Sequence, residues 1–218
     1  MRIHTLEFGS LLSYTPRGSS DKIRSARDIT LAIKTDHVLD QPPILPSEWI
    51  AKTVKQFMPS LPYASFLTSK PILVPVPSSS LMKEDTLWVP DRIAKSLVAN
   101  GIGREVVACL SRATAVPKSA TSDAPDRPKP LRHFETLAIQ ERISQPPDEI
   151  LLVDDIVTRG ATMWGAANRL AEAYPEAIIR GFAAVRTISN PYEFEELYRP
   201  VKGTIEFRED HQDTLRDP

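Results

Sequence analysis

Two adjacent aspartates, Asp154 and Asp155, follow the aliphatic run Ile150–Val153 and precede a Thr-Arg-Gly-Ala-Thr turn. Carboxylates at the end of a buried parallel strand are placed to accept hydrogen bonds from the hydroxyls of a sugar. Gly160 is free to adopt a positive φ, and the amides of residues 158–162 lead into a predicted helix, an arrangement that favours phosphate. Together these residues predict a site for a ribose 5-phosphate.

A second interpretation of the same residues has no ligand. Two aspartates after an aliphatic strand can simply cap the next helix, and Thr-Arg-Gly-Ala-Thr can be an ordinary turn. The whole run from Ile150 to Thr162, with four aliphatic, two acidic and two aliphatic residues before the turn, favours the sugar phosphate.

This run resembles the phosphoribosyl-pyrophosphate-binding signature of the type I phosphoribosyltransferases. The resemblance implies an α/β fold of three layers with a central parallel sheet and a small variable hood. It departs at Arg159, where the family usually has a small Thr or Ser, and we expect that arginine to point into solvent. The residues it assigns to phosphoribosyl pyrophosphate are Asp154, Asp155, Thr158, Arg159, Gly160, Ala161 and Thr162.

An earlier stretch, PILVPVPSSSLMK from Pro71 to Lys83, occupies the place of the family's pyrophosphate loop. The resemblance implies that Ser78, Ser79, Ser80 and Lys83 contact the pyrophosphate. A serine run after prolines is also typical of a plain turn, so that alternative stays open. The VPVP further resembles the ComF-like competence branch, although that branch's more basic loop and cysteine-rich zinc ribbon are missing here.

The stretch from Arg112 to Pro130 resembles in position the loop that closes over the leaving group in this family. Its basic residues include Lys118, for which the resemblance implies a catalytic role beside Asp154 and Asp155. It also implies Mg²⁺, with both aspartates acting on the metal indirectly, through phosphoribosyl pyrophosphate and water. By itself, a basic loop is more often solvated surface.

The implied reaction is transfer of the phosphoribosyl group to an unidentified, nucleobase-like acceptor with release of pyrophosphate, a step of nucleotide metabolism. Two alternatives stay open. The chain could be a non-catalytic regulator or partner protein that binds phosphoribosyl pyrophosphate or a nucleotide, or it could serve DNA uptake or defence, which only VPVP suggests. A homodimer is also left open.

Length and composition fit one domain of a globular protein. The chain has 218 residues, 41% of them hydrophobic and 25% charged, with a formal net charge of −1. That charge gives no argument for nucleic acid, and the absence of a long apolar run or signal peptide predicts a cytoplasmic protein without a membrane span. Within residues 1–218 we expect a core at 61–207, a hood or N-terminal extension at 1–60 and a solvated tail at 208–218.

Periodicity and punctuation predict the elements that position the site. Aliphatic strands alternating with amphipathic helices indicate a parallel sheet covered on both faces. The lone cysteine, Cys109, is expected to be buried and inert. Strands are expected near the amino terminus, from Ile72, at 104–110, 149–157 and 177–185; helices at 21–34, 47–58, 89–100, within 131–143 and at 161–174; and a helix with an edge strand within 190–207.

Overall fold

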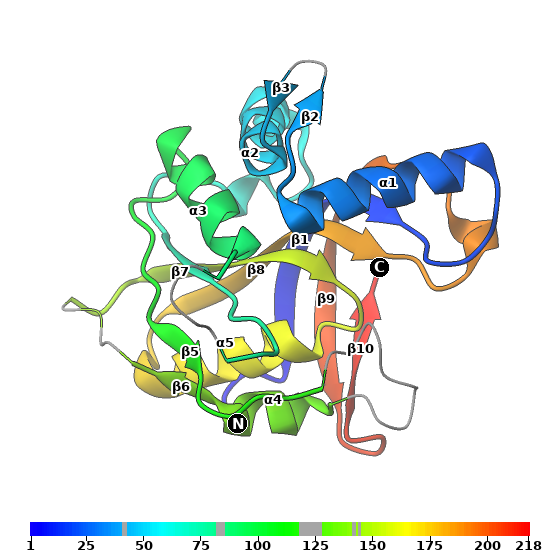
Figure 1. Ribbon diagram of the computed structural model, residues 1–218. Coiled ribbons are helices and arrows are strands. Elements are labelled where there is room, and N and C mark those ends of the chain that lie inside the picture. Colours follow the sequence, from blue (N-terminus) through cyan, green and yellow to red (C-terminus); the bar gives the residue numbers. More distant parts are fainter. Residues whose placement is uncertain (41–42, 82–85, 118–127, 141–142, 144) are drawn as a thin grey trace.

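Six strands form the main sheet of the computed structural model, which describes residues 1–40, 43–81, 86–117, 128–140, 143 and 145–218 (Figure 1). Their order is β10-β9-β1-β8-β7-β4, in which β1, β8, β7 and β4 are parallel and β9 and β10 antiparallel. The strands are β1 (Thr5–Tyr14), β4 (Ile72–Pro75), β7 (Glu149–Val157), β8 (Ile178–Thr187), β9 (Tyr198–Arg208) and β10 (Asp213–Asp217).

Helices cover both faces of this sheet. One face carries α1 (Asp21–Thr35), α2 (Pro46–Phe57) and α3 (Val89–Ala99), and the other carries α5 (Ala161–Ala173) with the short α4 (Pro130–Thr136), as Figure 1 shows. The expected three-layer α/β fold with parallel central strands is therefore confirmed. The remaining elements are β2 (Leu39–Asp40) paired with β3 (Pro43–Ile44), β5 (Leu110–Arg112) paired with β6 (Leu137–Ile139), and the 3₁₀ turns Met58–Ser60, Ala64–Phe66 and Pro191–Glu193.

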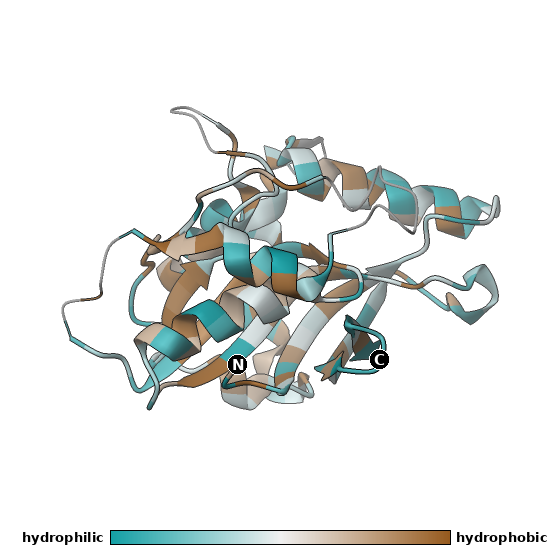
Figure 2. Ribbon diagram, turned by 90° about the horizontal axis from the view of Figure 1, so that it is seen from below, coloured by the Kyte–Doolittle hydropathy of each residue, from teal (hydrophilic) through white to brown (hydrophobic). Residues whose placement is uncertain are grey.

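Two hydrophobic clusters, one on each face, hold the layers together. Along β7, Ile150 and Leu152 pack with α5, whereas Leu151 and Val153 pack with the α1–α3 layer. Figure 2 shows hydrophobic colour concentrated in the strands and hydrophilic colour on the outer parts of the helices. A strand buried on both faces reads as a continuous apolar run, which is why β7 shows no polar alternation before its aspartates.

The predicted strand at 104–110 is wrong for most of its length. Leu73 of β4 donates to Glu105 O and accepts from Val107 N, and this single bridge is the extent of the pairing. Pro75, the next residue of β4 to face that edge, has no N–H, so the ladder cannot continue. The chain then leaves the main sheet, and its regular strand is β5, paired with β6.

Both ends of the chain contribute strands to the main sheet. Residues 5–14, placed in a hood or extension, form β1 between β8 and β9. Strand β9 is flanked on both sides, and the edge is instead β10, from the tail that we expected to be solvated. The tail has few aliphatic residues, and β10 is held by its ladder to β9 with Thr214 buried beneath it. The rest of the predicted division into hood, core and tail stays a prediction.

None of the helices in the described part of the chain is long and apolar enough to cross a bilayer.

Candidate functional site

The turn after β7 has the geometry that the sequence predicts for a phosphate cradle. Gly160 lies in the left-handed region at φ 84° and immediately precedes α5. It offers no side chain to cap the helix, so the first amides of α5 are left for another acceptor. A Cβ built at Gly160 would lie 2.5 Å from Cδ1 of Ile205 in β9, so glycine is required by space as well as by conformation.

The aspartates do not cap α5, so the interpretation of them as helix caps is wrong. Both lie within β7, where Oδ1 of Asp154 accepts from the amide of Asp155 at 2.9 Å. Oδ1 of Asp155 likewise accepts from the amide of Ile156 at 2.8 Å. The two carboxyl groups also interact with each other through their side chains.

The alternation of β7 breaks at this pair. Before it, odd-numbered side chains face the α1–α3 layer; after it, Ile156 packs with that same layer and Val157 with the α5 layer. Strand β1, which β8 separates from β7, has an irregularity in its pairing with β9 between Ser10 and Leu12, at the same level of the sheet. The register between β7 and β8 is the same on both sides of the pair, so the break is a local change in the backbone, and two adjacent side chains there no longer have to point to opposite faces.

Asp154 is the more perturbed of the two carboxyl groups. Burial raises its pKa well above the usual range, and the negative charge of Asp155 raises it further. A carboxyl group held in this way gains from any ligand that donates hydrogen bonds to it, because those bonds favour the charged form. Such perturbation is common at functional sites, although it is also found in structural clusters.

A cavity of about 430 Å³ opens beside Asp154 and the turn. Its volume lies in the range of sites for small molecules, about 300–1,000 Å³. One wall is Asp154 with residues 156–163, and it contains six of the predicted contacts: Asp154, Thr158, Arg159, Gly160, Ala161 and Thr162. Asp155 lies next to this wall but outside the lining. The other walls are the ends of β1 and β8, Pro128 and strand β10, which supply Tyr14, Pro16, Arg17, Thr187, Ser189, Thr214, Leu215 and Arg216.

Arg159 does not simply point into solvent, as we expected. Its side chain is 44% exposed, and its guanidinium forms an ion pair with Asp213 at the start of β10. Lys129 approaches the same carboxylate, with Nζ 3.7 Å from Oδ2. The arginine therefore joins the turn to the edge strand.

The predicted pyrophosphate loop lies outside the lining of this cavity and is closely bonded within the protein. The Ser78 hydroxyl donates to Ser80 O at 2.9 Å, and Ser79 O accepts from the amide of Val116. Nε of Arg112 donates to Ser78 O at 3.1 Å. Among the described residues, Arg112 has no carboxylate partner, although it is only 5% exposed. The buried positive charge of Arg112 therefore lies within hydrogen-bond distance of the serine loop.

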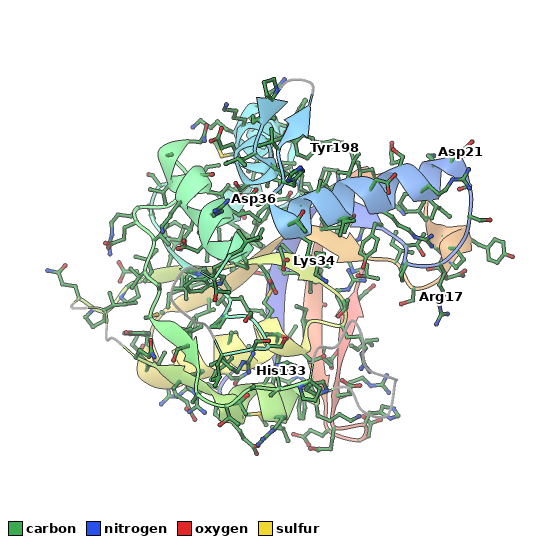
Figure 3. All side chains as sticks on the ribbon, viewed as in Figure 1. Arg17, Asp21, Lys34, Asp36, His133 and Tyr198 are labelled. Carbon is green, nitrogen blue, oxygen red and sulfur yellow. The ribbon has the colours of Figure 1, made fainter. Side chains whose placement is uncertain are left out.

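Arg112 is connected to the turn through His133 of α4, which Figure 3 labels. Its Nη1 donates to Thr136 Oγ1 at 2.7 Å, and its Nη2 lies 3.5 Å from Nδ1 of His133. Nε2 of His133 lies 3.4 Å from Thr162 Oγ1. Because arginine can only donate, Nδ1 is the acceptor and Nε2 carries the proton toward Thr162. Burial, with the charge of Arg112, lowers the pKa of His133 to about 4, so the ring is neutral at pH 7.

Two predicted contacts, Lys83 and Lys118, lie outside the described residues. Cys109 is buried as expected, and burial raises the pKa of its thiol to about 11, so it is not a nucleophile at neutral pH. The sequence analysis missed the roles of Arg112, Thr187, Thr214 and Arg216. These residues are far apart in the chain and match no spacing rule, and only the isolation of Arg112 from acidic neighbours in SRATAVPKSA hinted at one of them.

Comparison with protein-family models gives no match, and comparison with curated proteins gives none either. Solved structures do resemble the chain. One is a hypoxanthine phosphoribosyltransferase from Staphylococcus aureus, 12% identical at a TM-score of 0.34, covering 70% of this chain and 82% of that one. Another is an alanine mutant from an analysis of an invariant aspartic acid in HPRTs, 11% identical at a TM-score of 0.34, covering 87% and 90%. At this level of similarity we draw nothing about function from either structure.

Proposed function

We propose that the chain binds phosphoribosyl pyrophosphate in the cavity beside α5 and transfers its phosphoribosyl group to a nitrogen acceptor. One observation carries this proposal: Asp154 and the turn 158–162 line the same cavity at the carboxyl end of β7. Hydroxyl acceptors next to an anion cradle match the two ends of a ribose 5-phosphate.

The roles follow from position. The amides at the start of α5, with the hydroxyl of Thr162, bind the 5-phosphate. Asp154 accepts from the ribose hydroxyls, and Asp155 adds negative charge beside it. The serines 78–80 and the buried charge of Arg112 attract the diphosphate, and His133 links Arg112 to the phosphate turn. Lys118 and Lys83 remain predicted contributors to the charge around the leaving group.

The donor set fits Mg²⁺ only as a metal carried in with the substrate. No group of three or more metal-ligating side chains lies together in the described part of the chain. Mg²⁺ often binds through one or two carboxylates together with substrate phosphates and water, and Asp154 and Asp155 can supply that share. When bound, the metal would neutralise charge on the diphosphate.

The reaction needs positioning and charge stabilisation from this chain more than proton transfer. The bond between C1 of the ribose and the diphosphate oxygen breaks, and its electron pair leaves with the diphosphate. The lone pair of the acceptor nitrogen forms the new bond to C1, and the proton on that nitrogen is lost to solvent. Holding the sugar at both ends fixes C1 between acceptor and leaving group, which is a large part of what orientation contributes to catalysis.

The test is calorimetric titration with phosphoribosyl pyrophosphate and Mg²⁺, followed by an assay for pyrophosphate release with a panel of nucleobases and other nitrogen heterocycles. Binding with release that depends on one acceptor supports the transferase. Binding with no release across the panel favours a regulator that uses the same site. Absence of binding contradicts both and leaves the run at 150–162 as architecture.

A further inference from the structure

A second wall of the cavity, formed by Thr187 of β8 with Thr214 and Arg216 of β10, carries polar groups that the protein itself does not satisfy. The hydroxyls of Thr187 and Thr214 are buried and have no hydrogen-bond partner among the described residues. The same is true of Nε and Nη1 of Arg216. All three residues line the cavity that contains the phosphate turn. We call this group the threonine–arginine wall.

The wall is held in place by the fold. Nη2 of Arg216 donates to the carbonyl oxygen of Thr187, which ties β10 to the end of β8. On the other side, Asp213 of β10 pairs with Arg159 of the turn. These two contacts hold the edge strand to the end of β8 and to the turn before α5.

The charge of Arg216 is uncompensated. No carboxylate in the described part of the chain lies within ion-pair distance of it, and the nearest acidic residue of its strand toward the turn, Asp213, is already shared by Arg159 and Lys129. The neighbouring charge is positive: burial first, and Arg186 second, lower the pKa of Arg216 to about 10. The guanidinium still carries its proton at pH 7, with two of its nitrogens unpaired.

A buried donor or charge without a partner is costly, and protein interiors rarely leave several of them together. Here the unsatisfied groups belong to three residues that line one cavity, so a ligand with several acceptor oxygens that reached these buried atoms would satisfy them together. A guanidinium flanked by hydroxyls suits a planar or tetrahedral oxyanion.

We propose that the threonine–arginine wall is the binding site for an anionic group of the acceptor, so that the acceptor is an acidic nitrogen heterocycle. This inference rests on the proposed function. The 5-phosphate is assigned to the turn, and the diphosphate to the serine loop outside the lining of this cavity, so both phosphate groups of the donor have sites of their own. The second wall is therefore left for the molecule that reacts with the sugar.

The first experiment is calorimetric titration of inorganic phosphate into protein saturated with ribose 5-phosphate. The wild type should bind one further phosphate, and Arg216→Met should bind it at least roughly tenfold more weakly, since a charge-assisted contact is lost. Arg208→Met is the matched control, because Arg208 lies on the same hairpin but pairs with exposed Asp210 outside the cavity. No further phosphate in the wild type, or equal binding in Arg216→Met, would overturn the proposal.

A second titration distinguishes whether the wall binds an anionic group of the acceptor or a phosphate of the donor. Affinity for phosphoribosyl pyrophosphate should stay within about twofold in Arg216→Met. A loss of about tenfold or more would assign the wall to the donor's own phosphates and overturn the acceptor assignment. If the protein binds no ribose 5-phosphate, the proposed function is contradicted. The proposal for the wall is then tested separately, because phosphate titration of the free protein still shows whether Arg216 binds an oxyanion.

Thr214→Val distinguishes a binding role from a structural one. Valine has nearly the shape of threonine and removes a buried hydroxyl without a partner, so the melting temperature should stay the same or rise. Phosphate binding should weaken at the same time. A lower melting temperature with unchanged phosphate affinity would show that the hydroxyl supports the fold and would contradict its place in the wall.

Discussion

The cavity beside α5 and the serine loop after β4 differ in whether the protein itself satisfies the hydrogen bonds of their polar groups. At the cavity, the hydroxyls of Thr187 and Thr214 and two nitrogens of Arg216 have no hydrogen-bond partner in the described part of the chain. Next to the serine loop, Arg112 donates hydrogen bonds to Ser78 O, to Thr136 Oγ1 and to the carbonyl oxygen of His133. One region keeps its donors for a ligand, whereas the other uses them to hold its own backbone in shape.

The difference indicates that the two regions have different roles. Unsatisfied groups bind and discriminate, because a ligand that matches them relieves a cost already present in the free protein. A satisfied network contributes charge and rigidity instead. We therefore expect substitutions in the cavity to change affinity with little effect on folding, and substitutions under the serine loop to change both.

The largest effect is expected for Asp154→Asn combined with Asp155→Asn. Loss of charge-assisted hydrogen bonds to the ribose hydroxyls should reduce affinity for phosphoribosyl pyrophosphate by about 3 kcal/mol or more, roughly 100-fold. The melting temperature should stay the same or rise, because Asp154 is a buried carboxyl beside a second one. Calorimetry and thermal unfolding check this, with exposed Asp148→Asn as the control. Full affinity in the double variant would remove the aspartates from the site.

Arg112→Met tests the satisfied network. It leaves several buried acceptors without a donor, so the free energy of unfolding should fall by about 2–4 kcal/mol. Affinity for phosphoribosyl pyrophosphate should fall more than affinity for ribose 5-phosphate, since Arg112 stands under the loop assigned to the diphosphate. Urea unfolding and paired titrations measure the two effects. An equal loss for both ligands would mean that Arg112 supports the cavity only through the fold.

The dependence of the free energy of unfolding on pH should reveal the protonation of His133. Its pKa is about 4 in the folded chain and near the ordinary 6.5 when unfolded. The unfolded state therefore binds the proton first as pH falls, so stability is fully present above about pH 6.5 and is lost progressively toward about pH 4, by up to about 3 kcal/mol. His133→Gln should lose most of this slope in urea unfolding between these pH values. The same slope in both proteins would place the titrating group elsewhere.

Arg159→Ser should have the smallest effect. The ion pair with Asp213 is partly exposed, so its loss should cost less than about 1 kcal/mol. Affinity for phosphoribosyl pyrophosphate should change by less than about threefold, because the guanidinium is directed to β10 rather than to the phosphate. A loss of tenfold or more at low salt would assign Arg159 to the phosphate and weaken the contrast between the two walls.

The run from Ile150 to Thr162 was the most predictable part of the molecule because its order is local. A continuous aliphatic run fixes a buried strand, and a glycine before a helical pattern fixes the turn, so the strand, the turn and the helix that follows can be predicted from neighbouring residues. The same reasoning correctly stopped β4 near Pro75, where the missing N–H ends the ladder.

The second wall could not be predicted because it depends on contacts between residues that are far apart in the sequence. Thr187 and Arg216 meet only after β9 and β10 fold back across the sheet, and the sequence of β10 lacks the apolar pattern of a buried strand. Likewise, Arg112 and His133 come together across a proline-rich stretch with no spacing rule. The break in alternation at the aspartates could not be predicted either, since no residue type marks where the alternation of a strand changes.

The measurement that tests the central claim most directly is an amide ¹H–¹⁵N spectrum of the protein titrated with ribose 5-phosphate. We predict that the amides of Gly160, Ala161 and Thr162 shift together and saturate, with Asp155 and Ile156 following as the hydroxyls bind at the aspartates. If ribose 5-phosphate shifts other amides while those of residues 160–162 stay in place, the turn is not a phosphate cradle and the proposed function is contradicted.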